Sequence, residues 1–209
     1  MTDKLEWEGQ ITAVQPRIRL TRSFDERSHS YLGYSLHIDG YIDGKKGIFW
    51  VGIGKAAQAK HQFQVGVTAT GKCQPVADAN TETVDYYKAS ALAVVERPEP
   101  QEHDGPPWHG IPPELEIYRE RGHRRLSAKT YQTHCETCIW GCKMPVTMIL
   151  DQWNPDKRRY REETFCYGPK SCQQYSAGPK RKVPGRSGMT WEEEDWVDED
   201  ATRHRGPDD

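Results

Sequence analysis

The chain contains 209 residues, of which 35% are hydrophobic and 29% are charged, and its formal net charge is −2. Its mean hydropathy of −0.91 is strongly polar, so one large core is excluded and small domains joined by exposed segments are expected. No run of about 18 apolar residues is present, which excludes a membrane-spanning helix. Residues 1–8 lack the apolar stretch of a secretion signal, so we expect a cytoplasmic protein with reduced thiols and no membrane partner.

Several segments of the first hundred residues alternate apolar and polar side chains with a period of two, which is typical of β-strands. Residues 55–61 are rich in Ala and Gln and contain no β-branched residue, so they favour a short helix. Residues 71–79 have a loop-like composition. The segments that we expect to form strands are residues 7–20, 32–38, 48–51, 63–69 and 87–95.

The order of these elements points to a known architecture. Five strands with a helix between the third and the fourth is the order of the OB-fold, a small Greek-key barrel. Residues 5–98 resemble this fold in length as well. We therefore expect a mainly β chain that begins with a five-stranded OB-like barrel. The lone Cys73 within it is expected to be a packed or inert thiol.

A proline-rich linker with a short helix is expected over residues 99–130. Paired prolines and charged residues punctuate its first half, which is typical of a semi-rigid linker. Pro113 is suited to open a helix, and Gly122 is suited to stop it after Arg121.

Five of the six cysteines lie between Cys135 and Cys172, with the spacing C-x2-C-x3-C, then 23 residues, then C-x5-C. Between the two groups, residues 146–153 and 159–165 are strand-like and residues 154–157 form a turn signal. A hairpin returns its two ends to one place, so the late cysteines are expected beside the early ones. The arrangement resembles a zinc ribbon, and we expect a metal-binding module over residues 131–178. The candidate ligands are Cys135, Cys138, Cys142, Cys166 and Cys172.

Two inorganic groups fit this pattern. Zn²⁺ takes four thiolates in a tetrahedral site, but the x5 spacing and the fifth cysteine depart from a ribbon. A [4Fe-4S] cluster also takes four thiolates, and the run from Cys135 to Cys142 resembles part of a bacterial ferredoxin motif. His134 is a further candidate ligand. Both Zn²⁺ and an iron–sulfur cluster therefore remain open.

Basic residues at the expected hairpin tip favour nucleic-acid binding. Residues 131–190 carry 10 Lys and Arg against 5 Asp and Glu, and aromatic side chains are interleaved with them. Phosphates attract such charges, and aromatic rings stack on bases. Hairpin-tip charges can equally form a solvated face, and barrel aromatics can equally form core. The candidate contacts for single-stranded DNA or RNA are Lys157, Arg158, Arg159 and Arg161, together with Trp50 of the barrel.

Residues 179–209 form a tail that is basic at first and then acidic, and we expect it to be partly disordered. Residues 191–209 carry 2 Lys and Arg against 9 Asp and Glu. Because disordered tails contain few tryptophans, Trp191 and Trp196 suggest that the tail docks on the chain's own basic face or on a protein partner.

No catalytic signature is present. We therefore expect a metal-containing nucleic-acid-binding accessory protein, and the alternatives are an iron–sulfur electron carrier or redox sensor and a protein-binding adaptor.

Overall fold

The computed structural model describes residues 4–23, 26–99 and 105–209. The chain is mainly β, as expected. Its strands are β1 (Leu5–Arg22), β2 (Arg27–Ile42), β3 (Lys45–Ile53), β4 (Thr68–Pro75), β5 (Tyr86–Glu96), β6 (Arg124–Arg125), β7 (Gly141–Ile149), β8 (Arg158–Cys166), β9 (Arg181–Pro184) and β10 (Thr190–Glu193). Its helices are α1 (Lys55–His61), α2 (Leu115–Arg121), α3 (Ala128–Thr130) and α4 (Trp196–Thr202), with the short turns η1 (Ala79–Thr81), η2 (Tyr131–Cys135) and η3 (Arg186–Gly188).

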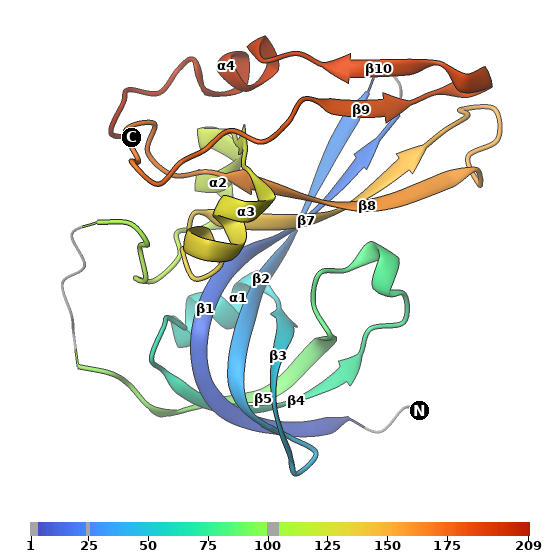
Figure 1. Cartoon of the computed structure of the whole chain (residues 1–209). Helices are drawn as coiled ribbons and strands as arrows, with labels where there is room; N and C mark the ends of the chain where they lie inside the picture. The colour runs from blue at the N-terminus through green and yellow to red at the C-terminus, as the bar shows by residue number, and fades with distance from the viewer. Residues whose placement is uncertain (1–3, 24–25, 100–104) are drawn as a thin grey trace.

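The first five strands close into a ring. Its order is β1-β2-β3-β5-β4, and it closes because β1 pairs with both β2 and β4. The connection between β3 and β4 contains α1, whose bounds are those expected from the sequence. Figure 1 shows the ring as the lower half of the molecule, with the β2–β3 turn at its lower end.

The fourth strand differs from its expected position, since β4 covers Thr68–Pro75 and takes up most of the segment expected to be a loop. Phe63 and Val67 are fully buried but precede the strand. The chain turns at Gly66, whose φ is +87°, and the Gly66 N–H donates to the carbonyl of Ile11 at 2.8 Å. The alternation of apolar side chains over residues 63–67 therefore reflects a buried turn and not a strand.

β4 gives only a weak hydrophobic signal in the sequence, because the side chains on its buried face are small. Ala69 and Cys73 are fully buried there, and between them Gly71 lies against the ring of Trp7. Cys73 is thus a packed core residue, as expected, and burial raises the pKa of its thiol to about 11.

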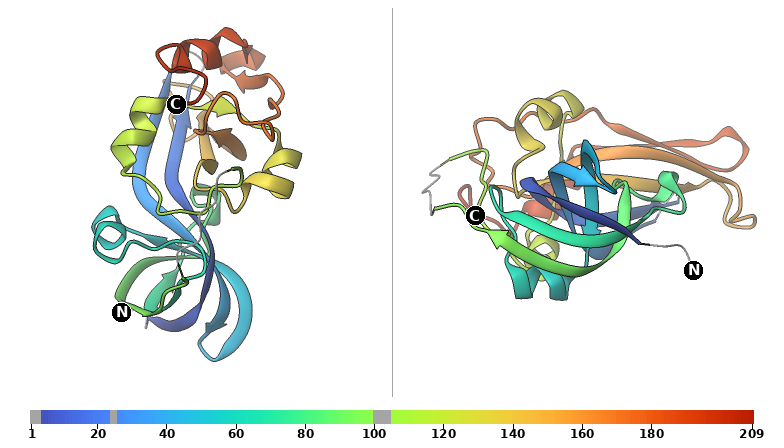
Figure 2. Two further views of the ribbon diagram at one scale, coloured as in Figure 1. Left: turned by 90° about the vertical axis from the view of Figure 1, so that its left-hand side faces the viewer. Right: turned by 90° about the horizontal axis from the view of Figure 1, so that it is seen from below.

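β1 and β2 extend beyond the ring and carry the rest of the molecule, which Figure 2 shows from two further directions. The end of β1 pairs in parallel with β7, and the sheet continues through β8 to β6. One core cluster contains ring residues such as Leu36 together with Val146 and Phe165. The expectation that the polar composition excludes a large shared core is therefore wrong, because β1 belongs to both halves.

The tail docks on basic residues of the chain itself, which is one of the two arrangements expected for it. β9 and β10 form a hairpin that precedes α4. Glu193 at the end of β10 is buried and accepts hydrogen bonds from Arg22 and Arg27, each at 2.9 Å. Asp198 of α4 accepts from Arg125 at 2.9 Å. The tail is thus attached by ion pairs to the ends of β1, β2 and β6.

Arg22 is the centre of a buried ionic cluster. Its guanidinium also contacts Glu163 on β8 at 3.2 Å, and Glu163 in turn pairs with Arg181 on β9. Both carboxylates and Arg22 are buried. Removing one member of such a cluster leaves an uncompensated charge in a medium of low polarity.

Glu193→Ala should lower the free energy of unfolding by about 3–5 kcal/mol, because Arg22 loses a buried partner. Glu192→Ala is the matched control, since Glu192 is exposed and should change stability by about 0.5 kcal/mol or less. Urea unfolding followed by circular dichroism measures both. Equal effects of the two substitutions would show that the ion pairs of Glu193 do not hold the tail.

Two histidines, His29 and His123, lie beside this cluster. The rings of His29 and His123 are 4.9 Å apart, and His123 also packs against Phe165. Burial, assisted by Arg27 and Arg22, lowers the pKa of His29 from 6.5 to about 4. Burial and the neighbouring His29 hold the pKa of His123 well below its usual value. Both rings are therefore neutral in the folded chain at neutral pH.

The folded chain should lose stability as the pH falls from 6.5 towards 4. Within this window His29 binds a proton when unfolded but not when folded, so protonation favours the unfolded chain. His29→Gln should reduce this loss by about 2 kcal/mol at the acidic end, as measured by urea unfolding at several pH values. His134→Gln, at an exposed position, is the control and should follow the unsubstituted chain.

Candidate functional sites

The β7–β8 hairpin brings together the early and the late cysteines. Its register pairs Gly141 with Cys166, so Cys166 returns beside the loop that carries Cys135 and Cys138. These three thiols are buried in one cluster, which Trp108, Trp140 and Tyr175 help to cover. Cys172 lies nearby in a turn, half-buried. The hairpin that the sequence predicted is confirmed.

The fifth cysteine of the group lies elsewhere. Cys142 faces the core shared by the ring and β7, where it is fully buried. Its thiol donates to the carbonyl of Pro16 at 3.4 Å, and burial raises its pKa well above the usual value. The structure therefore groups Cys135, Cys138 and Cys166 in one cluster, places Cys172 outside it, and places Cys142 apart in the shared core.

Backbone N–H groups point at the sulfurs of this cluster. The Gly168 N–H donates to Cys166 Sγ at 3.4 Å. Burial raises the pKa of the Cys138 thiol to about 11, and N–H groups of Trp140, Trp108 and Gly141 oppose that rise. N–H donors stabilise a negatively charged sulfur more than a neutral one. The surroundings are therefore suited to thiolates once a cation is present to compensate their charge.

Gln15 of β1 ties the ring to the cysteine loop, and the sequence gives no local signal for this role. Its side-chain amide donates to the carbonyl oxygens of Cys135 at 2.8 Å and Cys138 at 3.0 Å. Its oxygen accepts from the Tyr131 hydroxyl at 2.7 Å. A Cβ on Gly141 would lie 2.3 Å from the Cys135 carbonyl oxygen. The path of the loop thus depends on a buried amide and on a residue without a side chain.

The sulfurs are not arranged as a finished coordination site. Among the residues that the structure describes, no group of three or more His, Cys, Asp or Glu side chains is arranged to hold a metal ion. The further candidate His134 is exposed, although it adjoins Cys135. The fold brings three of the thiols close together, buries them, and supplies N–H donors to their sulfurs.

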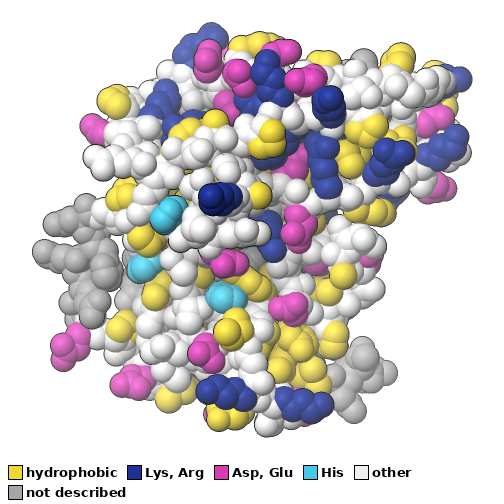
Figure 3. Space-filling view, in the orientation of Figure 1, with side chains coloured by type: hydrophobic (Ala, Val, Ile, Leu, Met, Phe, Trp, Pro, Cys, Tyr) yellow, Lys and Arg dark blue, Asp and Glu magenta, His cyan; other side chains and the backbone are white. Residues whose placement is uncertain are grey.

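A second candidate site is the tip of the β7–β8 hairpin. Lys157, Arg158 and Arg159 are exposed there, and Trp153 is 86% exposed. The tip is ordered by its own backbone, since the Leu150 N–H donates to the carbonyl of Lys157 at 2.9 Å. Figure 3 shows Lys and Arg side chains gathered over the upper half of the molecule, where β8, β9 and β10 lie.

The other two candidate contacts for nucleic acid are placed differently. Arg161 is half-buried, pairs with Glu163 and donates to the carbonyl of Lys182 at 2.7 Å, so it holds β9 against β8. Trp50 lies on β3 of the ring, where its ring stacks on that of His37 at 4.4 Å. The structure therefore groups Lys157, Arg158 and Arg159 but not Arg161 or Trp50 as a free surface.

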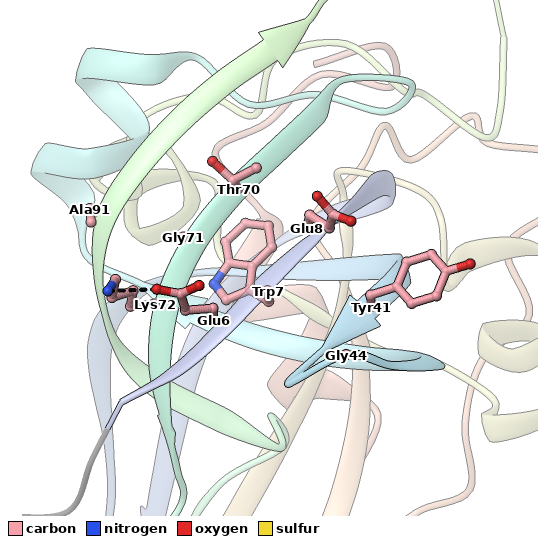
Figure 4. Close-up of a pocket in the computed structure, with 9 residues that line it drawn as sticks. All are labelled: Glu6, Trp7, Glu8, Tyr41, Gly44, Thr70, Gly71, Lys72 and Ala91. Atoms are coloured by element: carbon pink, nitrogen blue, oxygen red, sulfur yellow. Dashed lines mark ion pairs between the residues drawn. The ribbon is translucent and has the colours of Figure 1, made fainter.

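The sequence analysis did not predict a pocket that lies at the end of the ring remote from the β7–β8 hairpin. It has a volume of about 480 Å³ and opens where β1, β4, β5 and the β2–β3 turn meet. Figure 4 shows Trp7 in the middle, a Glu6–Lys72 ion pair on one side, and Glu8 and Tyr41 on the other. These residues come from strands distant in sequence, so only the folded ring reveals the pocket.

Comparison with known proteins gives no further guide to these sites. No protein-family model, no curated protein and no solved structure matches the chain. Within the described residues, none of the helices is both long enough and apolar enough to cross a membrane.

Proposed function

We propose that this protein binds single-stranded nucleic acid through the tip of the β7–β8 hairpin. The observation that carries the proposal is the exposure of Trp153 beside Lys157, Arg158 and Arg159. Among the described residues, none of these three cations has an ion-pair partner, so their charges are available to phosphates. An exposed indole offers a face on which an unpaired base can stack, whatever its sequence.

The strand order of the ring supports the same function. The order β1-β2-β3-β5-β4, with a helix between β3 and β4, is that of an OB-fold, and OB-folds often bind oligonucleotides. This support concerns the architecture alone and is weaker than the side chains at the hairpin tip. The outer face of the ring does carry the stacked pair of Trp50 and His37, but the neighbouring Arg17 and Arg19 are already paired with Glu82.

Trp153→Ala should weaken binding of a fluorescent single-stranded oligonucleotide by about 1–3 kcal/mol, because one stacking contact is lost. Arg159→Ala should reduce the slope of log K against log salt by about 0.7, because one phosphate contact is lost. Fluorescence anisotropy at several salt concentrations measures both effects.

The matched controls are Trp196→Ala and Lys46→Ala. Trp196 is 61% exposed but lies in the acidic tail, and Lys46 is exposed on the ring. Neither substitution should change the affinity or the salt slope. Oligonucleotide binding without salt dependence, or with equal loss in Trp196→Ala, would refute the assignment to the hairpin tip.

As part of the same proposal, one structural Zn²⁺ is held by Cys135, Cys138, Cys166 and Cys172. Support comes from the shared burial of three of these thiols and from the N–H donor at Cys166 Sγ. The separate position of Cys142 leaves a set of four, the number that tetrahedral Zn²⁺ requires. Because no three His, Cys, Asp or Glu side chains of the described residues are arranged as a ready site, metal binding would have to draw the sulfurs together, with loss of their protons.

Freshly isolated protein should contain one zinc per chain by elemental analysis, and Cys138→Ser should lose it together with most of its folded stability. Cys73→Ala is the control, because Cys73 is packed in the ring and should leave the zinc content unchanged. A brown protein that contains iron would indicate the cubane cluster instead. An absence of both metals in the unsubstituted chain would refute a metal centre.

A further inference from the structure

Three residues that line the pocket at the end of the ring carry polar side chains without a partner among the described residues. Glu8, Tyr41 and Thr70 occupy directly paired positions on β1, β2 and β4. Their side-chain oxygens form no hydrogen bond or ion pair within the described residues. Figure 4 shows the Glu8 carboxylate between Thr70 and Tyr41, beside the ring of Trp7. The Glu8 carboxylate is thus an unpaired polar group in a pocket of the size that is usual for small-molecule sites.

Trp7 adds an unsatisfied donor that is almost completely buried. Its side chain is 3% exposed, and its Nε1–H has no acceptor among the described residues. A buried donor without an acceptor destabilises the folded chain, because it has lost its hydrogen bond to water. In Figure 4 the indole nitrogen lies on the side of the ring that faces the Glu6–Lys72 ion pair. Both of those side chains are largely exposed, so they are free to move aside for a ligand that supplies the missing acceptor.

From this geometry we infer that the pocket binds one ring of a neutral sugar. Two carboxylates and one ammonium group give the pocket a net negative charge, which disfavours phosphates and carboxylates. A simple cation has no acceptor for the Trp7 N–H and would meet Lys72. Hydroxyl groups both donate and accept, so they can donate to Glu8 while accepting from Trp7 or Lys72.

Tyr41 supplies the apolar contact that a sugar ring needs. Its side chain is 46% exposed, and Figure 4 shows its hydroxyl directed away from Trp7, so that the ring borders the pocket. The C–H face of a pyranose is apolar and can cover such a ring, while its hydroxyls reach the carboxylates. Pocket volumes of about 300–1,000 Å³ are usual for small ligands, and this one, at about 480 Å³, has room for a sugar ring.

The backbone at the pocket is strained. Ala91 of β5 lines it and has a φ of +50°, in the left-handed region that residues with a Cβ rarely adopt. Such conformations are energetically unfavourable and are frequent at ligand sites. Ala91 lies where the pairing between β4 and β5 shifts its register, between Thr70 and Lys72. Gly71 lies at the same place and leaves space for the ring of Trp7.

The test is a titration of the ¹⁵N-labelled full chain with a panel of neutral disaccharides: cellobiose, maltose, lactose and N,N′-diacetylchitobiose. At least one should bind with a millimolar dissociation constant and shift the indole N–H signal of Trp7 downfield, because that donor gains an acceptor. Glu8→Gln should weaken this binding about tenfold, since a hydrogen bond to a charged group is lost. Tyr41→Ala should weaken it as well.

Glu192→Gln is the control variant and should bind sugar like the unsubstituted chain. Circular dichroism should confirm that both pocket variants remain folded, and their affinity for oligonucleotides should be unchanged, because the pocket and the hairpin tip are separate. The inference is overturned if no disaccharide shifts the Trp7 signal, or if Glu8→Gln and Glu192→Gln bind equally well. Stronger shifts with methylammonium or with inorganic phosphate would overturn the assignment to neutral sugars.

Discussion

The structure depends on one strand that serves two sheets. β1 is paired with β2 and β4 where it closes the ring, and with β7 where it leaves the ring. Backbone pairing alone would leave the two halves free to twist, but Gln15 fixes the cysteine loop from the middle of this strand. Each of its three buried hydrogen bonds satisfies a group that would otherwise be costly to bury. The position of the cysteines is therefore set by the ring as much as by their own hairpin.

At its far end the same strand sets the position of the tail. Arg22 is buried and ends β1 between Glu163 and Glu193. A guanidinium has several donors in a fixed plane, so it can join carboxylates from two different elements. Some acidic residues of the tail thus form ion pairs with buried or half-buried arginines. Among the described residues, no acidic partner is found for Lys157, Arg158 or Arg159. Net charge hides this difference, because it counts paired and unpaired groups alike.

Local patterns in the sequence were enough for the elements that depend on neighbours in the chain. Residues 55–61 form α1, α2 ends at Arg121 before Gly122, and the hairpin around residues 154–157 returns Cys166 to the early cysteines. In each case the signal is a cap, a turn or a period within about ten residues. The order of these strands and of α1 along the chain also predicted a five-stranded ring.

Features that depend on distant residues could not be predicted in this way. Arg22 has no local signal of burial, because the carboxylates that surround it come from β8 and β10. Cys142 belongs to the cysteine run in sequence but faces the core, because β7 lies against β1. The pocket could not be predicted from the sequence either, because its lining residues come from four strands. Trp7 and Glu8 are adjacent on β1, so their side chains point to opposite faces of a regular strand.

β1 and β2 approach each other closely beside the pocket that these two side chains line. Gly9 faces Gly40 across the strands, and a Cβ on Gly9 would lie 2.6 Å from the Asp39 carbonyl oxygen. Two strands that approach this closely can bend sharply at the corner of the ring. The buried indole of Trp7 and the exposed carboxylate of Glu8 border the same pocket beside this corner. The two glycines that permit this close approach directly follow Glu8 on β1 and directly precede Tyr41 on β2, so the corner of the ring adjoins the pocket.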